Sequence, residues 1–417
     1  MEYLPRTVDD ELDVLLPLAP AVAIDGPKGV GKTDTARRRA DSVWFLDDPA
    51  QQDIARADFA LASVPDGGTI LIDEWQKVPQ VWDSVRRQVD AGAAPGRFLL
   101  TGSASPVDRA GTHSGAGRIL SMRMRPMGLH ERGVVAPSVS LSRLLAGEAD
   151  EIAGQTPFAL TDYAEAIVDG GFPGIMRAAP RLRRRLLDAY LSRIIDRDLP
   201  EQGYEVRRPE TLRRWLAAYA GASSTQTAYS RLLDATAGGD GSRPAKTTTI
   251  AYRDHLTQLW LLDPVPGWAS VNNPVRRVQQ APKHQLADPA LAARLLGLTS
   301  TSLLNGPGTH MAGPLFESLT TLGVRVMAQA AQASVSHLRA RNGDREVDLV
   351  VEGDDGRVLG IEVKLARDVT GADVRHLVWL REQMPDRIVD LIVITTGSTA
   401  YRRSDGVAVV PLALLGA

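Results

Sequence analysis

Short apolar runs separated by stretches with helical spacing are the main pattern in the first third of the chain. The runs at residues 21–24, 69–74 and 97–100 each hold at least three consecutive apolar residues, and 43–49 reads as a further strand and turn. Strands alternating with helices predict a parallel sheet covered by helices on both faces. In such a sheet the residues that follow each strand meet at one edge, where ligands bind.

The middle of the chain is predicted to be helical. Residues 181–198 place apolar side chains at helical spacing opposite a row of arginines, and further helices are expected after Pro209, around 228–235 and around 248–259. The Gly-rich segment 238–244 is predicted to be a flexible loop. A short hairpin is expected at 259–265, so the segment has the outline of a winged helix.

In a winged helix, the third of these helices would be the one that meets DNA. Its first turns carry the polar residues Lys246, Thr247, Thr248, Thr249 and Tyr252. Winged helices also serve as protein-contact modules, and the sequence leaves both uses open.

The last third of the chain returns to a mixture of helices and strands. A helix is expected to open at Gly313, followed by strands at 345–351 and 358–364, a helix at 373–382 and a strand at 391–395. The sequence thus predicts an α/β fold with four parts. These are an N-terminal domain of parallel sheet (1–135), a helical connector (136–200), a winged-helix-like domain (201–290) and a C-terminal α/β domain (291–417).

Composition excludes several classes of site. The 417 residues include no cysteine, so disulfides, thiolate metal sites and thiol nucleophiles are ruled out. The net charge of −2 argues against a uniformly basic nucleic-acid coat but allows local basic surfaces. The longest apolar run, at 12–24, is interrupted by one aspartate and two prolines and is too short to cross a bilayer. We therefore expect a cytoplasmic protein with no membrane partner.

The most specific motif is a phosphate-binding loop. It has the pattern G-x-x-x-x-G-K-[ST], follows the strand at 21–24 and opens a helix, and its residues are Gly26, Pro27, Lys28, Gly29, Val30, Gly31, Lys32 and Thr33. The glycines let backbone N–H groups point at an anion. Lys32 is expected to reach the β- and γ-phosphates, and the Thr33 hydroxyl to ligate Mg²⁺. The loop predicts binding of ATP or GTP with Mg²⁺.

Acidic and hydroxyl residues follow the next strands of the same sheet. Asp73 is expected to place Mg²⁺ and Glu74 to polarise the water that attacks the γ-phosphate. Thr101 and Ser103 end the strand at 97–100, where a polar residue can sense that phosphate, although a plain strand-to-turn junction is the alternative. Arg118 is a candidate arginine finger, with an ordinary ion pair as the alternative. The base-reading string Asn-Lys-x-Asp of GTPases is absent, which favours ATP.

A second acidic constellation lies in the last third of the chain. Glu317 is on the expected helix, Asp348 is on a strand, and Glu362 and Lys364 alternate along the next strand, which puts their side chains on one face. The ordered set resembles the restriction-endonuclease-like PD-(D/E)xK core. Asp348 and Glu362 would then hold a hard divalent cation, and Lys364 would orient or deprotonate water against a phosphodiester. Ordinary ion pairs, or a nuclease-like fold without activity, are the alternatives.

Several motifs together resemble a prokaryotic family of AAA-type (AAA+) ATPases that join an ATPase domain to a largely uncharacterised C-terminal region. They are GPKGVGKT (26–33), LIDEWQKVP (71–79), LLTGSAS (99–105), GGFPG (170–174), DRDL (196–199), and Pro282-Lys283 followed by Asp288. The chain departs from the family at 126–131, where members carry an aromatic-rich segment.

Taken together, the sequence predicts a Mg²⁺-dependent ATPase of AAA+ type. We hypothesise that ATP turnover controls an action on DNA through the winged-helix and nuclease-like domains. The alternative is a nucleotide-gated regulatory or binding protein whose C-terminal domain cuts no phosphodiester.

Overall fold

The fold is described from a computed structural model, which divides into two compact units. One unit comprises Met1–Arg125 with Gln258–Trp260, and the other comprises Pro126–Thr257 with Leu261–Ala417. The structure describes residues 3–58, 61, 67–103, 116–149, 151–237, 244–268, 281–340 and 344–417. Residues 238–243 of the loop predicted at 238–244, and the last two residues of the segment 99–105, lie outside these ranges.

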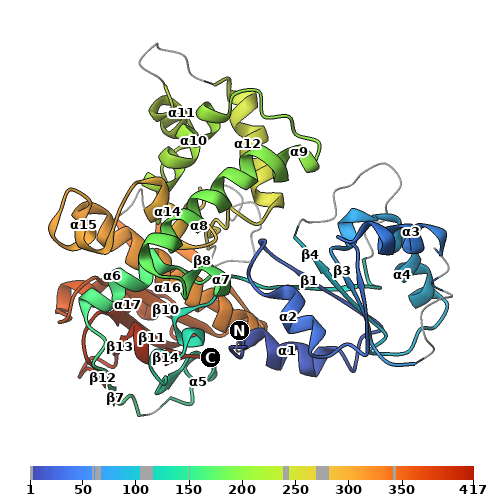
Figure 1. Cartoon of the computed structure of the whole chain (residues 1–417). Helices are drawn as coiled ribbons and strands as arrows, with labels where there is room; N and C mark the ends of the chain where they lie inside the picture. The colour runs from blue at the N-terminus through green and yellow to red at the C-terminus, as the bar shows by residue number, and fades with distance from the viewer. Residues whose placement is uncertain are drawn as a thin grey trace. The chain divides into compact units, whose positions relative to one another are not determined.

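The first unit is built on a five-stranded sheet in the order β2-β3-β4-β1-β5, with every neighbouring pair parallel. β1 therefore lies between β4 and β5, the last two strands of this sheet in sequence, and the loop that leaves it opens where the strand order reverses. Figure 1 shows this sheet in blue to cyan. The strands are β1 (Ala21–Asp25), β2 (Ser42–Phe45), β3 (Ile70–Asp73), β4 (Phe98–Gly102) and β5 (Leu120–Arg123).

Burial on both faces explains why these strands read as continuous apolar runs. Every residue of β1, β3 and β4 is buried. One core cluster joins alternate strand residues such as Ala23, Ile72 and Leu100 to Trp82 on the amphipathic helix α4. The helices of this unit are α1 (Thr7–Leu15), α2 (Lys32–Arg37), α3 (Pro49–Ala57) and α4 (Gln80–Asp90).

The second unit contains a mixed seven-stranded sheet in the order β7-β12-β13-β11-β10-β9-β8. Its central pairs β10–β11 and β11–β13 are parallel, whereas β9 is antiparallel to β10 and to β8. The strands are β7 (Gly154–Gln155), β8 (Ala333–Ala340), β9 (Arg345–Gly353), β10 (Val358–Val363), β11 (Ile388–Thr395), β12 (Thr399–Arg402) and β13 (Ala408–Pro411). The strands and helices expected in the last third of the chain are thus present.

Two short strands from early in this unit join its far end. β7 pairs with β12, and β6 (Val139–Ser140) pairs in parallel with β14 (Leu415–Gly416). The segment 136–155, expected to belong to a helical connector, therefore contributes strands to the C-terminal α/β layer. Strands of two residues carry no periodicity, so the hydrophobic pattern gave no sign of them.

Helices complete the second unit. α17 (Gly371–Gln383) packs its buried residues Val374, Leu377 and Leu380 against the sheet, and α16 (Ala312–Ala330) contacts β8 and β10. The remaining helices are α5 (Leu141–Ala146), α6 (Leu160–Asp169), α7 (Pro173–Met176), α8 (Pro180–Arg193), α9 (Leu199–Glu201), α10 (Pro209–Gly221), α11 (Tyr229–Ala235), α12 (Lys246–Gln258), α14 (Pro289–Leu295) and α15 (Ser300–Asn305). A π-helical turn, Ile194–Asp198, follows α8.

The three helices expected in the middle of the chain are α10, α11 and α12 (Figure 1). After them, isolated antiparallel bridges join Leu262 to Leu286 and Val265 to Lys283 in place of a regular hairpin. The expectation that Thr249 and Tyr252 face DNA is wrong. Both side chains are buried, and the Tyr252 ring packs edge-on against Trp215 and Tyr204.

The GGFPG segment (170–174) forms a close-packed junction. A Cβ on Gly171 would lie 2.3 Å from the Met127 carbonyl oxygen, and the Gly171 N–H donates to the Asp288 carboxylate at 2.6 Å. Asp288 also caps α14 by accepting from Ala290 N at 2.8 Å. Asp288 is completely buried, and burial raises the pKa of its carboxyl while the Arg132 guanidinium opposes the shift. These motif residues hold the second unit together.

Within the described residues, the structure holds no helix with the length and apolar character needed to cross a membrane.

Candidate functional site

The phosphate loop has the backbone geometry that its glycines predict. Gly26, Gly29 and Gly31 have φ angles of 157°, 78° and 102°, and Gly31 is the residue before α2. At Gly26 a Cβ would lie 2.1 Å from the Met124 carbonyl oxygen, so only glycine fits. The loop is also anchored from outside the motif. Buried Arg6 donates from Nη1 to the Val30 carbonyl at 2.8 Å and from Nη2 to the Arg125 carbonyl at 2.8 Å.

Lys32 folds back over its own loop. Its Nζ donates to the carbonyl oxygens of Gly26 and Pro27, both at 2.8 Å. Burial lowers the pKa of Lys32 to about 8, while the carboxylates of Glu74 and Asp25 act in the opposite direction. The ammonium is thus held inside the loop by neutral carbonyl acceptors. A charged phosphate oxygen is a stronger acceptor and can take their place.

Two of the predicted residues, Thr33 and Thr101, converge on the carboxylate of a third, Asp73. Thr33 Oγ1 donates to Asp73 Oδ1 at 2.8 Å, and Thr101 Oγ1 donates to the same oxygen. Asp73 is buried at the tip of β3, and Thr101 is buried near the end of β4. These hydroxyl and carboxylate oxygens are the donor set that Mg²⁺ takes in phosphate-loop proteins, so the residues present fit that ion.

Glu74 is held in an unusual backbone conformation beside this carboxylate. It has φ 53° and ψ 43°, in the left-handed region that non-glycine residues seldom adopt. Its carboxylate accepts hydrogen bonds from Gln76 Nε2 and, at 3.3 Å, from Ser103 Oγ. Gln76 also donates to Ser103 Oγ at 3.0 Å. Gln76 was not predicted to be a site residue. Its position, two residues after the Asp73-Glu74 pair, is the sequence signal that could have indicated it.

Two further polar residues of the first unit are Asp25 and Arg118. Asp25, the last residue of β1, was not predicted, and burial raises its pKa to about 6 although Lys32 opposes the shift. Its Oδ1 is buried without a hydrogen-bond partner in the described part of the chain. Arg118, the candidate finger, forms an exposed ion pair with Asp90 at 2.9 Å, which is the plainer of its two predicted roles.

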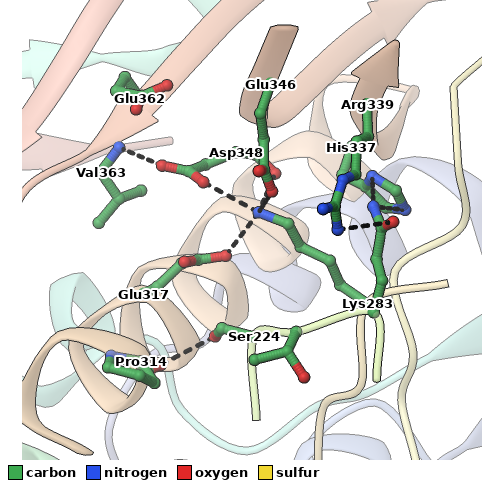
Figure 2. Close-up of polar contacts among 12 residues, drawn as sticks. Ser224, Lys283, Pro314, Glu317, His337, Arg339, Glu346, Asp348, Glu362 and Val363 are labelled. Atoms are coloured by element: carbon green, nitrogen blue, oxygen red, sulfur yellow. Dashed lines mark hydrogen bonds and ion pairs between the residues drawn. The ribbon is translucent and has the colours of Figure 1, made fainter. Parts of the chain in front are cut away.

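The group of acidic residues in the second unit surrounds a lysine for which no role was predicted from the sequence. Lys283, 1% exposed, extends its side chain from the bridge with Val265 into a group of carboxylates (Figure 2). Its Nζ lies 2.9 Å from Glu317 Oε1, 2.9 Å from Asp348 Oδ1 and 3.6 Å from Glu346 Oε1. These carboxylates raise the pKa of Lys283 far above its usual value, against the effect of burial.

Glu362 and Lys364 lie beside this group, as predicted. Lys364 Nζ donates to Glu362 Oε1 at 2.8 Å, and the Val363 N–H donates to Asp348 Oδ2 at 2.9 Å. Burial, reinforced by Asp348, raises the pKa of both Glu362 and Glu317. Across the described ranges, no set of three or more His, Asp or Glu side chains is arranged to hold a metal ion.

Comparison with known proteins divides the chain into three blocks. Residues 19–132 match the family described as an AAA domain, residues 160–302 match a domain of unknown function (DUF8612), and residues 312–415 match another (DUF4143). Residues 19–132, which contain the phosphate loop and the Asp73 site, therefore form an AAA-type, ATPase-like domain.

Two relatives match along most of the chain. The chain is 29% identical over 404 residues to the uncharacterized proteins Rv2008c of Mycobacterium tuberculosis and Mb2031c of Mycobacterium bovis, an alignment covering 94% of this chain and 80% of each relative. Among solved structures, the Walker-type ATPase PABY2304 of Pyrococcus abyssi is similar at 15% identity with a TM-score of 0.41. That match covers 70% of this chain and 96% of the other.

Proposed function

We propose that the first unit binds ATP with Mg²⁺ and hydrolyses it. The observation that carries this proposal is the convergence of Thr33 and Thr101 on the Asp73 carboxylate, directly beside the phosphate loop. When bound, Mg²⁺ would neutralise charge on the phosphate oxygens, held by Thr33 and Asp73. Turnover of ATP by the full chain, dependent on Mg²⁺ and lost when EDTA is added, tests the proposal.

Each residue of the site has a part in this function. The amides of residues 26–33 cradle the phosphates, and Lys32 exchanges the Gly26 and Pro27 carbonyls for phosphate oxygens. Glu74 accepts a proton from the attacking water, and Gln76 and Ser103 fix the direction of its carboxylate. Thr101 lies on β4 and Ser103 directly after it, and β4 lies between β1 and β3. These two hydroxyls are therefore placed to respond to movement of the terminal phosphate.

A second candidate function belongs to the second unit, which we propose acts on nucleic acid. Asp348 lies on β9 and Glu362 on the adjacent strand β10, and Lys364 directly follows β10, which supports metal-dependent cleavage of a phosphodiester. α12 presents Lys246 and Thr247 to solvent and Thr248 in part, which leaves a smaller DNA-binding face than the five predicted residues.

Two assays test the second function. Plasmid cleavage with Mg²⁺ or Mn²⁺ should be seen with the wild type and lost in Asp348→Ala and Lys364→Ala. A salt titration of DNA binding should give a steep negative slope, reduced by about one in Lys246→Ala. No cleavage by the wild type would favour the nucleotide-gated regulatory protein, in which the C-terminal acids are structural.

A further inference from the structure

Arg6 reaches the phosphate loop from outside the residues that match the AAA domain, which begin at residue 19. Its charged side chain is buried, and two different nitrogens of its guanidinium group are used. Nη1 donates to the Val30 carbonyl within the loop and Nη2 donates to the Arg125 carbonyl, both at 2.8 Å. Because a buried charge is costly unless it is hydrogen-bonded, these contacts hold the guanidinium in one position.

The two carbonyls join the loop to a single neighbouring segment. Met124 and Arg125 directly follow β5. The Met124 carbonyl oxygen lies so close to Gly26 that a Cβ there would be 2.1 Å away, so the start of the loop rests on this segment. Arg6 then ties Val30, later in the loop, to Arg125. The loop is thus fixed to this segment at two points, and Arg6 supplies the second.

The contact with Val30 also sets the direction of a backbone donor. The Val30 carbonyl and the Gly31 N–H belong to one trans peptide group, which is planar, with the two bonds pointing in opposite directions. Because the carbonyl points toward Arg6, the Gly31 N–H points away from it. Gly31 has a φ angle of 102°, which a glycine adopts without strain. Backbone N–H groups of this loop are the donors that would bind phosphate, so Arg6 orients one of them.

Arg6 is itself held by α1, which it directly precedes. The Asp9 carboxylate accepts from the Arg6 N–H at 2.7 Å, and the Asp9 N–H donates to the Arg6 carbonyl at 2.9 Å. The same carboxylate accepts from the Tyr3 hydroxyl at 2.8 Å and from Arg39 Nη1 at 3.0 Å. Figure 1 shows α1 beside α2, the helix that the phosphate loop opens. The backbone of Arg6 therefore has a fixed place beside the loop.

We propose that Arg6 is a positioning residue for nucleotide binding. By holding the Val30 and Arg125 carbonyls together, it keeps the phosphate loop in the conformation that receives the triphosphate. That role rests on the first function proposed above, the binding of ATP with Mg²⁺. Arg6 acts through the backbone of the loop and not on the water that attacks the phosphate, so it should govern the affinity for ATP and not the rate of hydrolysis. The segment before residue 19 would then complete a nucleotide site whose motif lies after it.

The test is the Kd of the full chain for ATP in Mg²⁺, measured together with turnover at saturating ATP. Arg6→Lys keeps the charge but offers one nitrogen in place of the planar fork, so it cannot hold both carbonyls in the same way. Its Kd should rise by about tenfold or more, since charge-assisted hydrogen bonds that orient the loop are lost. Turnover at saturating ATP should stay within about twofold of the wild type. Partial unfolding would do the opposite, because it lowers the turnover and leaves the Kd of the folded molecules unchanged.

Arg39→Met is the matched control. Arg39 forms ion pairs with Asp9 and Asp13, so its loss weakens the same junction without removing the contact to Val30. This variant should bind ATP as the wild type does. An Arg6→Lys variant with wild-type affinity, or an equal loss in Arg39→Met, would overturn the inference while ATP binding stands. A wild type that binds no ATP would overturn the first proposed function together with it. If Arg6→Lys does not fold, Arg6→Gln removes the buried charge, and the same rise in Kd is required of it.

Discussion

Thr33 Oγ1 donates a 2.8 Å hydrogen bond to Asp73 Oδ1, although 40 positions separate the two residues in sequence. The bond joins the first helical turn after β1 to the tip of β3. Since β4 lies between those strands and supplies Thr101 to the same oxygen, the site is preorganised by the sheet itself. Preorganised donors and acceptors need little rearrangement when a ligand arrives.

Replacing Lys32 tests the phosphate contact. Lys32→Ala should raise the Kd for ATP by about tenfold to a hundredfold, because charge-assisted hydrogen bonds to phosphate are lost. Titration with a fluorescent ATP analogue in Mg²⁺ measures the change. Lys28→Ala is the matched control. That position of the motif offers its backbone N–H to the phosphates, so the variant should keep the wild-type affinity for ATP. Equal losses in the two variants would mean that general loop charge, and not Lys32, binds the phosphates.

Glu74→Gln separates hydrolysis from binding. The amide cannot take a proton from water, so the turnover rate should fall by about a hundredfold or more while the affinity for ATP persists. Single-turnover phosphate release gives the rate. Asp53→Asn, an acid-to-amide change on the exposed side of α3, should leave the rate unaltered. Turnover by Glu74→Gln at the wild-type rate would remove Glu74 from the mechanism.

Two glycines of the GGFPG segment should respond very differently to alanine. Gly171→Ala forces a Cβ into the Met127 carbonyl at 2.3 Å and should destabilise the second unit by about 2 kcal/mol or more. A Cβ at Gly174, within α7, meets nothing within 4 Å, so Gly174→Ala should change stability by less than about 0.5 kcal/mol. Thermal unfolding compares them. Equal midpoints would show that the junction tolerates the displacement.

His337 predicts a loss of stability on acidification. Burial, with the Lys283 charge, lowers the pKa of His337 to about 4. The unfolded chain takes up a proton near the usual histidine pKa and the folded chain does not, so stability present above about pH 6.5 is lost toward pH 4. Between pH 7.5 and 5.5 the loss from this residue is about 1 kcal/mol.

The check is urea unfolding at those two pH values. His337→Gln should reduce the dependence of the unfolding free energy on pH. The remaining dependence should come from buried His284, whose pKa is also lowered by burial. The exposed His310→Gln variant should track the wild type. A His337→Gln slope as steep as that of the wild type would assign the pH dependence to other groups.

The arrangement of Asp73 and Thr101 beside the phosphate loop was predictable because its signals are local. Each of these residues lies at the end of a buried strand or in the loop after one. Parallel strands bring their carboxyl ends to one edge, so Asp73 and Thr101 could be placed near Lys32 from sequence order alone. The left-handed backbone of Glu74 could not be predicted, since nothing in the residue type favours it. The anchoring of the loop by Arg6 was also hidden, because its carbonyl partners are not encoded by side chains.

The cluster in the second unit was only partly predictable. Alternation along β10 correctly put Glu362 and Lys364 on one face, and the helix and strands of Glu317 and Asp348 are where the pattern placed them. Lys283 comes from a segment whose isolated bridges have no hydrophobic periodicity, and its partners lie 34 and 65 residues away. Long-range charge pairing of this kind depends on packing, which a single sequence does not display. The buried face of α12 was misjudged because its apolar residues form no clear stripe.

The pairing of β7 with β12 and of β6 with β14 has a consequence for synthesis on the ribosome. Residues 139–155 emerge well before their partners at 399–402 and 415–416, so these short strands must wait for nearly the whole of the second unit. Contacts this distant in sequence slow folding and leave strand edges uncovered meanwhile. The five strands of the first unit, by contrast, are complete by residue 123. Vectorial synthesis therefore favours folding of the five-stranded sheet while the second unit is still incomplete.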